Sequence, residues 1–145
     1  ALSADVRFAT TDSRFGIPAA KLGLGYEYEG LAKLARLVGP SRARDIMFSA
    51  RFMPAKEALD IGLINFIEEH DYIEGACVSY AKSIAENAPL TVKAAKAAIN
   101  AWERGSRKEE TKAVRAMVDA CFDSEDYREG RKAFAAKRKP EFKNR

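Results

Sequence analysis

The sequence has very little of what disulfide frameworks and metal centres need. It contains two cysteines, Cys77 and Cys121, and a single histidine, His70. Two cysteines are too few for a disulfide framework, and with one histidine they form no metal-ligand cluster. No apolar run approaches the roughly 20 residues that cross a bilayer, and no charged-then-apolar leader pattern is seen. We therefore expect a soluble, cytoplasmic or organelle-matrix protein that holds no metal.

The chain does have enough apolar material to build a core. Of its 145 residues, 47% are hydrophobic and 32% are charged. This balance excludes an intrinsically disordered chain. The length is typical of one ordinary domain, which buries roughly two-thirds of the surface that its unfolded chain exposes.

Positive charge is concentrated at the C-terminal end. The net charge is +4, but residues 128–145 hold eight Lys or Arg against two Glu, a local balance of +6. The remaining residues therefore carry 17 basic and 19 acidic groups. Such a basic tail favours an anionic partner, whether phosphate, nucleic acid or another protein. The alternative is a solvated helix end whose charges only aid solubility.

Hydrophobic periodicity predicts short strands followed by a mostly helical chain. Val6 and Phe8 alternate with Arg7, the period-2 pattern of a strand. Residues 14–17 and 63–67 have the composition of two further short strands. Spacings of three and four residues predict helices over about 31–38, 41–48, 55–59, 73–87, 89–105, 107–122 and 125–139.

Single residues predict several helix starts and buried faces. Ser41 is expected to be an N-cap, Pro54 to open a short helix, and Ser106–Glu109 to form a capping box. Cys77 and Cys121 are expected to be small buried thiols. Helical spacing predicts two further buried faces, one made by Val92, Ala95, Ile99 and Trp102, the other by Val114, Met117, Val118 and Cys121.

Residue types alone offer few candidates for chemistry. His70 lies among acids at a predicted helix start, where a surface cap is the expected role. Glu27 and Glu29 flank Tyr28 in a glycine-bounded loop, and two nearby acids are suited to general acid–base work. Solvated loop carboxylates are the alternative. The glycines of this loop do not have the spacing of a phosphate-binding loop.

The basic tail contains a second candidate. Phe134 and Lys137 are three residues apart, so a continuous helix would place them on one face. An aromatic ring beside an ammonium, with Arg138 and Lys139 adjacent, is suited to stacking an adenine and pairing with phosphates. The alternative is a buried Phe134 with lysine stems running over it to solvent.

Several stretches together resemble the crotonase family (enoyl-CoA hydratase/isomerase). Their order and spacing carry the resemblance, which covers the whole chain and corresponds to the second half of a family member. The stretches are residues 4–9, Phe15-Gly16-Ile17-Pro18-Ala19 with Leu22-Gly23, residues 37–39, Ala50-Arg51, residues 55–65, residues 89–100 and Phe122 through Pro140.

The resemblance implies an α+β, mostly helical fold, the C-terminal portion of a crotonase-like fold with a helical trimerisation region. Residues 1–67 would belong to the enzyme core, and residues 68–145 to a helical oligomerisation and CoA-contacting region. The strands would leave open edges by themselves. We therefore expect a homo-oligomer, a trimer or a hexamer, together with the missing N-terminal half.

The resemblance also implies a site. Family members bind an acyl-CoA thioester as substrate, without a separate cofactor, and point two backbone N–H groups at its carbonyl oxygen as an enolate forms. Those donors, and one hydratase glutamate, would precede residue 1. The second glutamate falls at Ala19, so Glu27 is the nearest remaining acid. Phe15, Pro18 and Ala19 would contact the acyl group, and Phe134 and Lys137 the CoA.

These observations favour a C-terminal fragment of a crotonase-like acyl-CoA enzyme that is inactive alone. The alternative is a helical interaction module that binds an acidic protein or nucleic acid through its basic tail. No RNA-binding strand motif or zinc-finger spacing supports that alternative, so neither a nucleic acid nor a membrane is expected as partner.

Overall fold

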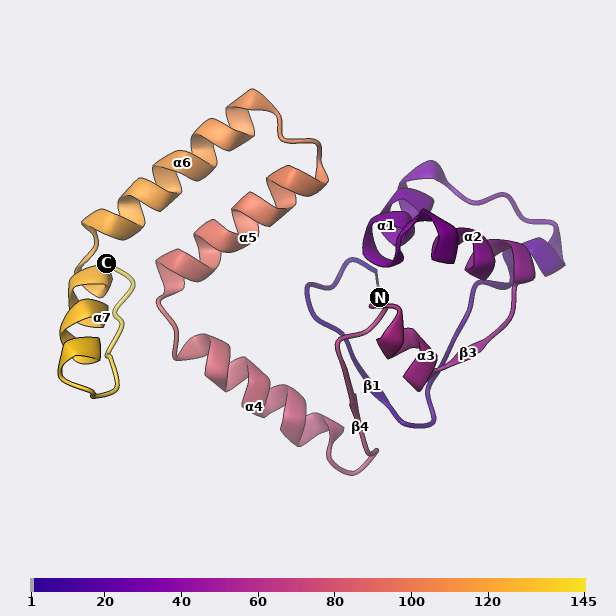
Figure 1. Ribbon diagram of the computed structural model, residues 1–145, viewed down its shortest axis with the longest axis horizontal. Helices are drawn as coiled ribbons and strands as arrows, with labels where there is room; N and C mark the ends of the chain where they lie inside the picture. Colours follow the sequence, from indigo (N-terminus) through magenta and orange to yellow (C-terminus); the bar gives the residue numbers. More distant parts are fainter. Residues whose placement is uncertain (1) are drawn as a thin grey trace. The chain divides into compact units, whose positions relative to one another are not determined.

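The computed structural model describes residues 2–145, which form two compact units (Figure 1). The units meet at Cys77 and Val78, inside helix α4 (Ile73–Ala85). The fold is α+β and mostly helical, as expected. None of the helices over residues 2–145 is both long and apolar enough to cross a membrane.

Two short sheets lie in the first unit. Strand β1 (Phe8–Thr10) pairs in parallel with β4 (Phe66–Glu68), and the rings of Phe8 and Phe66 stack with centroids 4.7 Å apart. Strand β2 (Arg14–Phe15) pairs antiparallel with β3 (Met53–Pro54). Strands β1, β2 and β4 lie near predicted positions, whereas β3 was not predicted.

Strand β4 begins later than the predicted span of 63–67 because the first residues of that span hydrogen-bond to the end of the preceding helix. The N–H groups of Leu63 and Ile64 both donate to the carbonyl of Ala58, at 2.8 and 3.3 Å, and so end helix α3 (Ala55–Asp60). The side-chain amide oxygen of Asn65 accepts from the Arg7 N–H at 2.8 Å. Pairing with β1 therefore starts only at Phe66.

Helices α1 (Tyr28–Val38), α2 (Pro40–Ser49) and α3 enclose the core of the first unit, with a short 3-10 helix, η1 (Pro18–Leu22), before them. Leu34 and Val38 are one helical turn apart and both are buried. The largest buried side chains of this core are Leu34, Val38, Ile46, Met53, Leu63 and Ile64.

Two predicted helix starts are wrong by one or two positions. Helix α2 begins at Pro40 with Gly39 as its N-cap, so Ser41 does not cap it. Proline suits the first helical position, because its φ is fixed and its missing N–H would have no intrahelical partner there. Pro54 lies one residue before α3, as its N-cap and the last residue of β3.

The second unit contains most of α4 and helices α5 (Pro89–Glu103), α6 (Lys108–Asp123) and α7 (Glu125–Ala135). Helices α5 and α6 lie side by side as a hairpin (Figure 1). On α5 the buried residues are the small Ala94 and Ala101, whereas Ile99 is 59% and Trp102 68% exposed. Val92 and Ala95 are exposed too, so the predicted buried face of α5 is wrong.

Helix α6 also differs from the prediction. Ser106 has a left-handed backbone (φ 55°) and its N–H donates to Ala101 at 2.8 Å, so it closes α5. Arg107 is the N-cap of α6, and no capping box forms. Val114, Met117 and Cys121 are half-buried and Val118 is exposed. Cys77 is exposed, and therefore is not the buried thiol expected.

Helix α7 begins where predicted and ends earlier. The Ser124 hydroxyl accepts from the Tyr127 N–H at 3.0 Å, an N-cap. At the other end, Lys137 has a left-handed backbone (φ 52°) and the Arg138 N–H donates to Ala133 at 3.0 Å. This bond pattern closes a helix, so the chain leaves the helix before Pro140 can block it.

Gly16→Ala should destabilise the first unit. A Cβ at Gly16 would lie 2.7 Å from the Arg51 carbonyl oxygen, a backbone atom just before β3. We expect a loss of about 1–3 kcal/mol in the free energy of unfolding, as for other overpacked sites, measured by urea denaturation. Gly75→Ala in α4 is the control, because its Cβ would meet open space and alanine favours helices by up to ~1 kcal/mol. Equal midpoints for both variants would contradict the close approach.

Candidate functional site

An apolar hollow of about 430 Å³ opens in the first unit beside the end of β2. Phe15, Gly16 and Ile17 form one part of its wall, and Tyr26 and Leu34 another. The remaining lining residues are Leu2, Ser3, Arg7, Gly30, Lys33, Ile46, Met53, Leu63 and Ile64. The hollow can therefore receive an apolar group. Among these lining residues there is no carboxylate.

The cations that line the hollow are already engaged. The Arg7 guanidinium donates to the carbonyls of Leu63 at 2.7 Å and Ala4 at 2.5 Å. The Lys33 ammonium lies 3.2 Å from the Ser3 hydroxyl. These contacts fasten the chain before β1 to the core. Sequence reasoning did not predict Arg7 or Lys33 as lining residues, because no local pattern links them to Phe15.

The segment at Phe15 is positioned by β3 and by Arg51. Phe15 pairs with Met53, and Gly16 lies directly against the Arg51 backbone. The Arg51 guanidinium donates to Asp45 at 2.8 Å and to both carboxylate oxygens of Glu57. The hydrogen bond from Arg51 lowers the pKa of the Glu57 carboxyl, and the Glu57 and Asp45 carboxylates raise the pKa of Arg51. This network ties α2 to α3 on either side of β3.

Ala19 and Glu27 lie in very different surroundings. Ala19 is 4% exposed inside η1, which ends at Gly23 in the left-handed region (φ 66°). Glu27 is exposed and is the residue before α1, where its carbonyl accepts from the Leu31 N–H at 3.2 Å. Its neighbour Tyr26 lines the hollow, but Glu27 does not. A methyl group at position 19 cannot move a proton.

Phe134 and Lys137 do not share a helical face, contrary to the prediction. Helix α7 ends at Ala135, and Lys137 lies in the turn that follows, its N–H donating to the Phe134 carbonyl at 3.1 Å. Phe134 is 87% exposed, so it is not a core residue. The two side chains are available to a partner, from the last turn of α7 and from the turn behind it.

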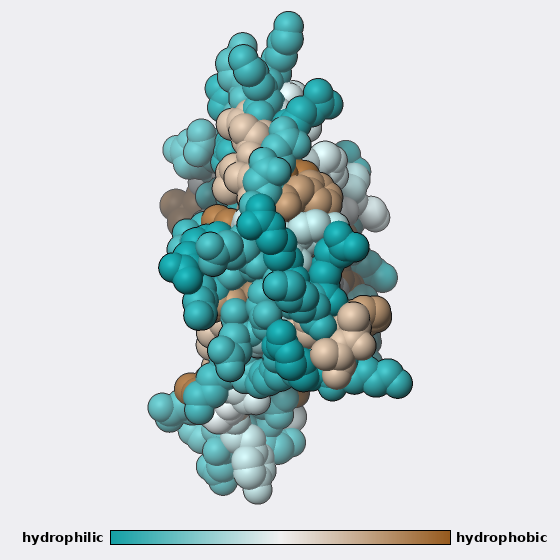
Figure 2. Space-filling view, turned by 90° about the vertical axis from the view of Figure 1, so that its left-hand side faces the viewer, coloured by the Kyte–Doolittle hydropathy of each residue, from teal (hydrophilic) through white to brown (hydrophobic). Residues whose placement is uncertain are grey.

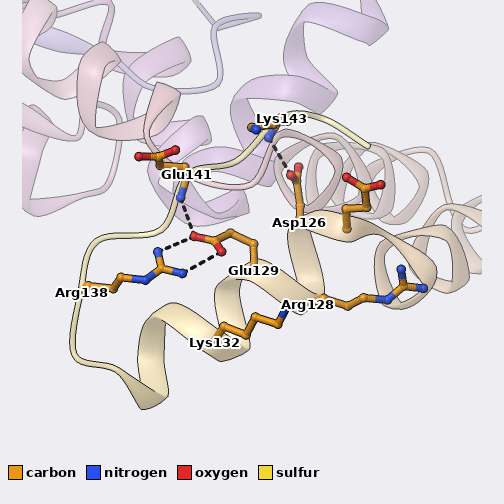
Figure 3. Close-up of a pocket in the computed structure, with 8 residues that line it drawn as sticks. Asp126, Arg128, Glu129, Lys132, Arg138, Glu141 and Lys143 are labelled. Atoms are coloured by element: carbon orange, nitrogen blue, oxygen red, sulfur yellow. Dashed lines mark hydrogen bonds and ion pairs between the residues drawn. The ribbon is translucent and has the colours of Figure 1, made fainter.

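Three of the tail's basic side chains, Arg138, Lys139 and Arg145, pair with acids of the second unit, and Figure 3 shows the first of these pairs. Arg138 donates to both oxygens of Glu129, at 2.6 and 2.9 Å, and the Glu141 N–H also donates to Glu129, at 3.0 Å. The Arg138 hydrogen bond and then that of Glu141 lower the pKa of Glu129 to about 2. Lys139 pairs with Glu86 at 2.7 Å. The tail is thus less available to a general polyanion than its composition indicates.

No group of three or more His, Cys, Asp or Glu within residues 2–145 is arranged to hold a metal ion. The exposed His70 and Cys77 and the half-buried Cys121 lie on separate elements.

Comparison with known proteins identifies the family. The sequence model of the enoyl-CoA hydratase/isomerase family matches residues 1–145. The chain belongs to this family. Among curated family relatives, it is 39% identical to a short-chain-enoyl-CoA hydratase of Clostridium acetobutylicum, over 100% of the chain and 56% of the relative. It is 32% identical to a methylmalonyl-CoA decarboxylase of Escherichia coli, over 97% of the chain and 55% of the relative.

Solved structures of the family agree with the fold. An enoyl-CoA hydratase/isomerase family protein from Hyphomonas neptunium superposes with a TM-score of 0.88 at 33% identity, covering 99% of this chain and 55% of that one. An enoyl-CoA hydratase from Mycobacterium tuberculosis gives 0.87 at 31% identity, covering 99% and 57%. The chain spans about half the length of the curated relatives it matches, as the resemblance implies.

Glu129→Gln should lower thermal stability at neutral pH more than in acid. The pKa of Glu129 in the folded protein, about 2, lies below the ordinary value of 4.5. The carboxylate's stabilising contribution is therefore complete above pH 4.5 and is lost as the pH falls toward 2. Melting curves of the two proteins should therefore converge over that interval. Glu141→Gln is the control, because Glu141 contacts Glu129 through its backbone N–H. A gap that stays constant from pH 7 to pH 2 would contradict the pairing.

Proposed function

We propose that the chain supplies the acyl-group pocket and the CoA-contacting tail of an acyl-CoA enzyme of the enoyl-CoA hydratase/isomerase type. One observation carries this proposal: the family match covers every residue, and the stretch Phe15-Gly16-Ile17 that carries the resemblance lines an apolar hollow. An apolar wall of this kind suits the hydrocarbon part of a thioester. Phe15 would contact the acyl group; Pro18 and Ala19, the other two residues expected there, follow in η1 and do not line the hollow.

The chain's own residues supply only part of such a reaction. Enolate formation next to a thioester needs backbone N–H groups directed at the carbonyl oxygen, and a group that moves a proton. By the resemblance, the N–H groups belong to the part of the relatives that this chain does not span. Ala19 stands where the resemblance places a glutamate, and no carboxylate lines the hollow. Hydration by this chain alone is therefore not expected.

Glu27 is the proposed acid of the site. It follows Tyr26, a lining residue of the hollow, and its carboxylate makes no capping hydrogen bond to α1. An exposed carboxylate at the start of a helix that makes no capping hydrogen bond can take a proton from a substrate that reaches it. The two relatives named for hydration and for decarboxylation agree with a family scaffold that accommodates more than one reaction.

Phe134 and Lys137 are proposed to contact CoA, the ring against adenine and the ammonium against phosphate. The exposure of Phe134 supports a stacking role because the ring is not needed for packing within its own unit. Arg138 and Lys139 are engaged by Glu129 and Glu86. A binding module for nucleic acid or an acidic protein, the other interpretation of the tail, is not favoured by the family match.

Assembly is part of the proposal. Large apolar side chains of α5 face solvent, and apolar patches interrupt the hydrophilic surface in Figure 2. The two-stranded sheets of the first unit have unpaired edges among the described residues. Such surfaces would be covered by assembly into a homo-oligomer, either a trimer or a hexamer. A polypeptide that corresponds to the other half of the relatives would cover more of them. We place the protein in the cytoplasm or an organelle matrix.

The chain alone should not hydrate crotonyl-CoA measurably. The expected result is a decay of enoyl-thioester absorbance no faster than in buffer, because no oxyanion donors are assigned to this chain and position 19 is alanine. A complete enoyl-CoA hydratase is the positive control. Turnover well above buffer that survives Glu27→Ala would contradict both this expectation and the proposed acid.

In the protein assembled with the counterpart half, Lys137→Ala should weaken CoA binding about fivefold at low salt and flatten its salt dependence, because one ion contact is lost. Calorimetry at two salt concentrations measures both effects. Lys143→Ala is the matched control, since it removes one charge from the same tail and keeps the backbone contact to Asp126. If both variants bind alike, the tail acts through net charge and not through a contact of Lys137.

A further inference from the structure

A second apolar hollow of about 430 Å³ lies in the first unit, among η1, α1 and α2. Leu31 and Ala35 of α1 and Ala43 and Met47 of α2 line it. Its other lining residues are Ala20, Leu24, Tyr26, Pro40, Arg44 and Phe48, of which only Arg44 is charged. This second hollow, like the one beside β2, therefore suits an apolar group and not a polar one.

Tyr26 is the one lining residue that the two hollows share. Helix α1 presents Gly30 and Leu34 to the hollow beside β2, and Leu31 and Ala35 to the second hollow. Each of these pairs is four residues apart and thus follows one face of the helix. Leu34 is only 1% exposed, so packed core separates the hollows along α1. Before the helix begins, the Tyr26 ring separates them.

Local sequence places this ring over the first turn of α1. Glu27 is the N-cap, so Tyr26 and Leu31 hold the two positions of a hydrophobic staple, one before the cap and one in the first turn. Gly30 has no side chain in the way: a Cβ there would lie only 3.3 Å from the Tyr26 ring. Tyr26 is 47% exposed, so the core of the unit does not depend on it.

We propose that Tyr26 sets the length of acyl chain that the hollow beside β2 accepts. This inference rests on the proposed acyl-group pocket and adds a specificity-determining residue to it. A short acyl group lies against Phe15 and ends at the Tyr26 ring. A longer chain is turned into water by the ring, and its outer methylenes gain no apolar contact. The pocket therefore favours short acyl thioesters.

The energy of burying methylenes makes the boundary measurable. Each methylene moved from water to an apolar surface strengthens binding about fourfold. Without the ring, the two hollows form one apolar surface, and the end of a long chain can lie on Leu31 and Met47. Removal of the ring should therefore improve the binding of long acyl groups and leave short ones nearly unchanged.

Tyr26→Ala in the 145-residue chain tests the boundary. The probes are butyryl and octanoyl thioesters of N-acetylcysteamine, which present an acyl group without the CoA that the tail is proposed to contact. Their dissociation constants are measured by NMR titration. The ratio of octanoyl to butyryl affinity should rise at least about tenfold over the unmodified chain, because two newly buried methylenes already exceed that factor.

Two matched variants control for the ring and for the loop. Tyr26→Phe keeps the ring, and Tyr28→Ala removes an 80% exposed ring that lines neither hollow. Both should change the affinity ratio by less than about twofold. Tyr26→Leu keeps apolar packing on Leu31 but is shorter than tyrosine. It should raise the ratio by less than alanine does, and it decides the question if Tyr26→Ala does not fold.

The position of the chain end is a second readout. In the unmodified chain, octanoyl thioester should shift the amide signals of Gly16 and Ile17 but not those of Ala43 and Met47. In Tyr26→Ala it should shift both sets. An unchanged affinity ratio in Tyr26→Ala, an equal rise in Tyr28→Ala, or shifts at Ala43 and Met47 in the unmodified chain would overturn the boundary alone.

Failure of the underlying pocket has its own signature. If neither thioester shifts the Gly16 and Ile17 amides in any of these proteins, the proposed acyl-group pocket is wrong, and the role of Tyr26 falls with it. Shifts at Gly16 and Ile17 with an affinity ratio that ignores Tyr26 would leave the pocket in place and reject only the boundary.

Discussion

The close approach of Gly16 to the Arg51 carbonyl fixes the position of Phe15 in the wall of the hollow beside β2. Because no side chain separates them, β2 pairs with β3 and Phe15 comes opposite Met53. Arg51 is in turn held by Asp45 and Glu57, from α2 and α3. The hollow beside Phe15 therefore depends on a backbone contact between segments far apart in the sequence, supported by one arginine.

Local patterns predicted where helices and strands lie better than they predicted which of their residues are buried. The turn at Gly39 and Pro40, the start of α7 and the family-typical stretch at Phe15 depend on neighbouring residues, and these were predicted closely. The exposed face of α5 was missed because periodicity marks an apolar stripe without saying what covers it. The capping box failed because the Ser106 N–H is used to close α5, in competition with capping α6.

The candidate site followed the same division. The resemblance places Ala19 at a defined position of the family pattern, whereas Glu27 was chosen as the nearest remaining acid and stays a prediction. Arg7 and Lys33 could not, because they line the hollow through contacts to Leu63 and Ser3 that no spacing encodes. The tail illustrates the point for charge: its composition indicated a free basic segment, whereas Arg138 pairs with Glu129 and Lys139 with Glu86.

The burial of Ala19 has a consequence for any attempt to install an acid at this position. At 4% exposure its methyl group is almost wholly enclosed, and a well-packed site resists a longer side chain. A carboxylate at position 19 would therefore require neighbouring residues to shrink or shift as well. The open loop at Glu27 accommodates an acid without such rearrangement.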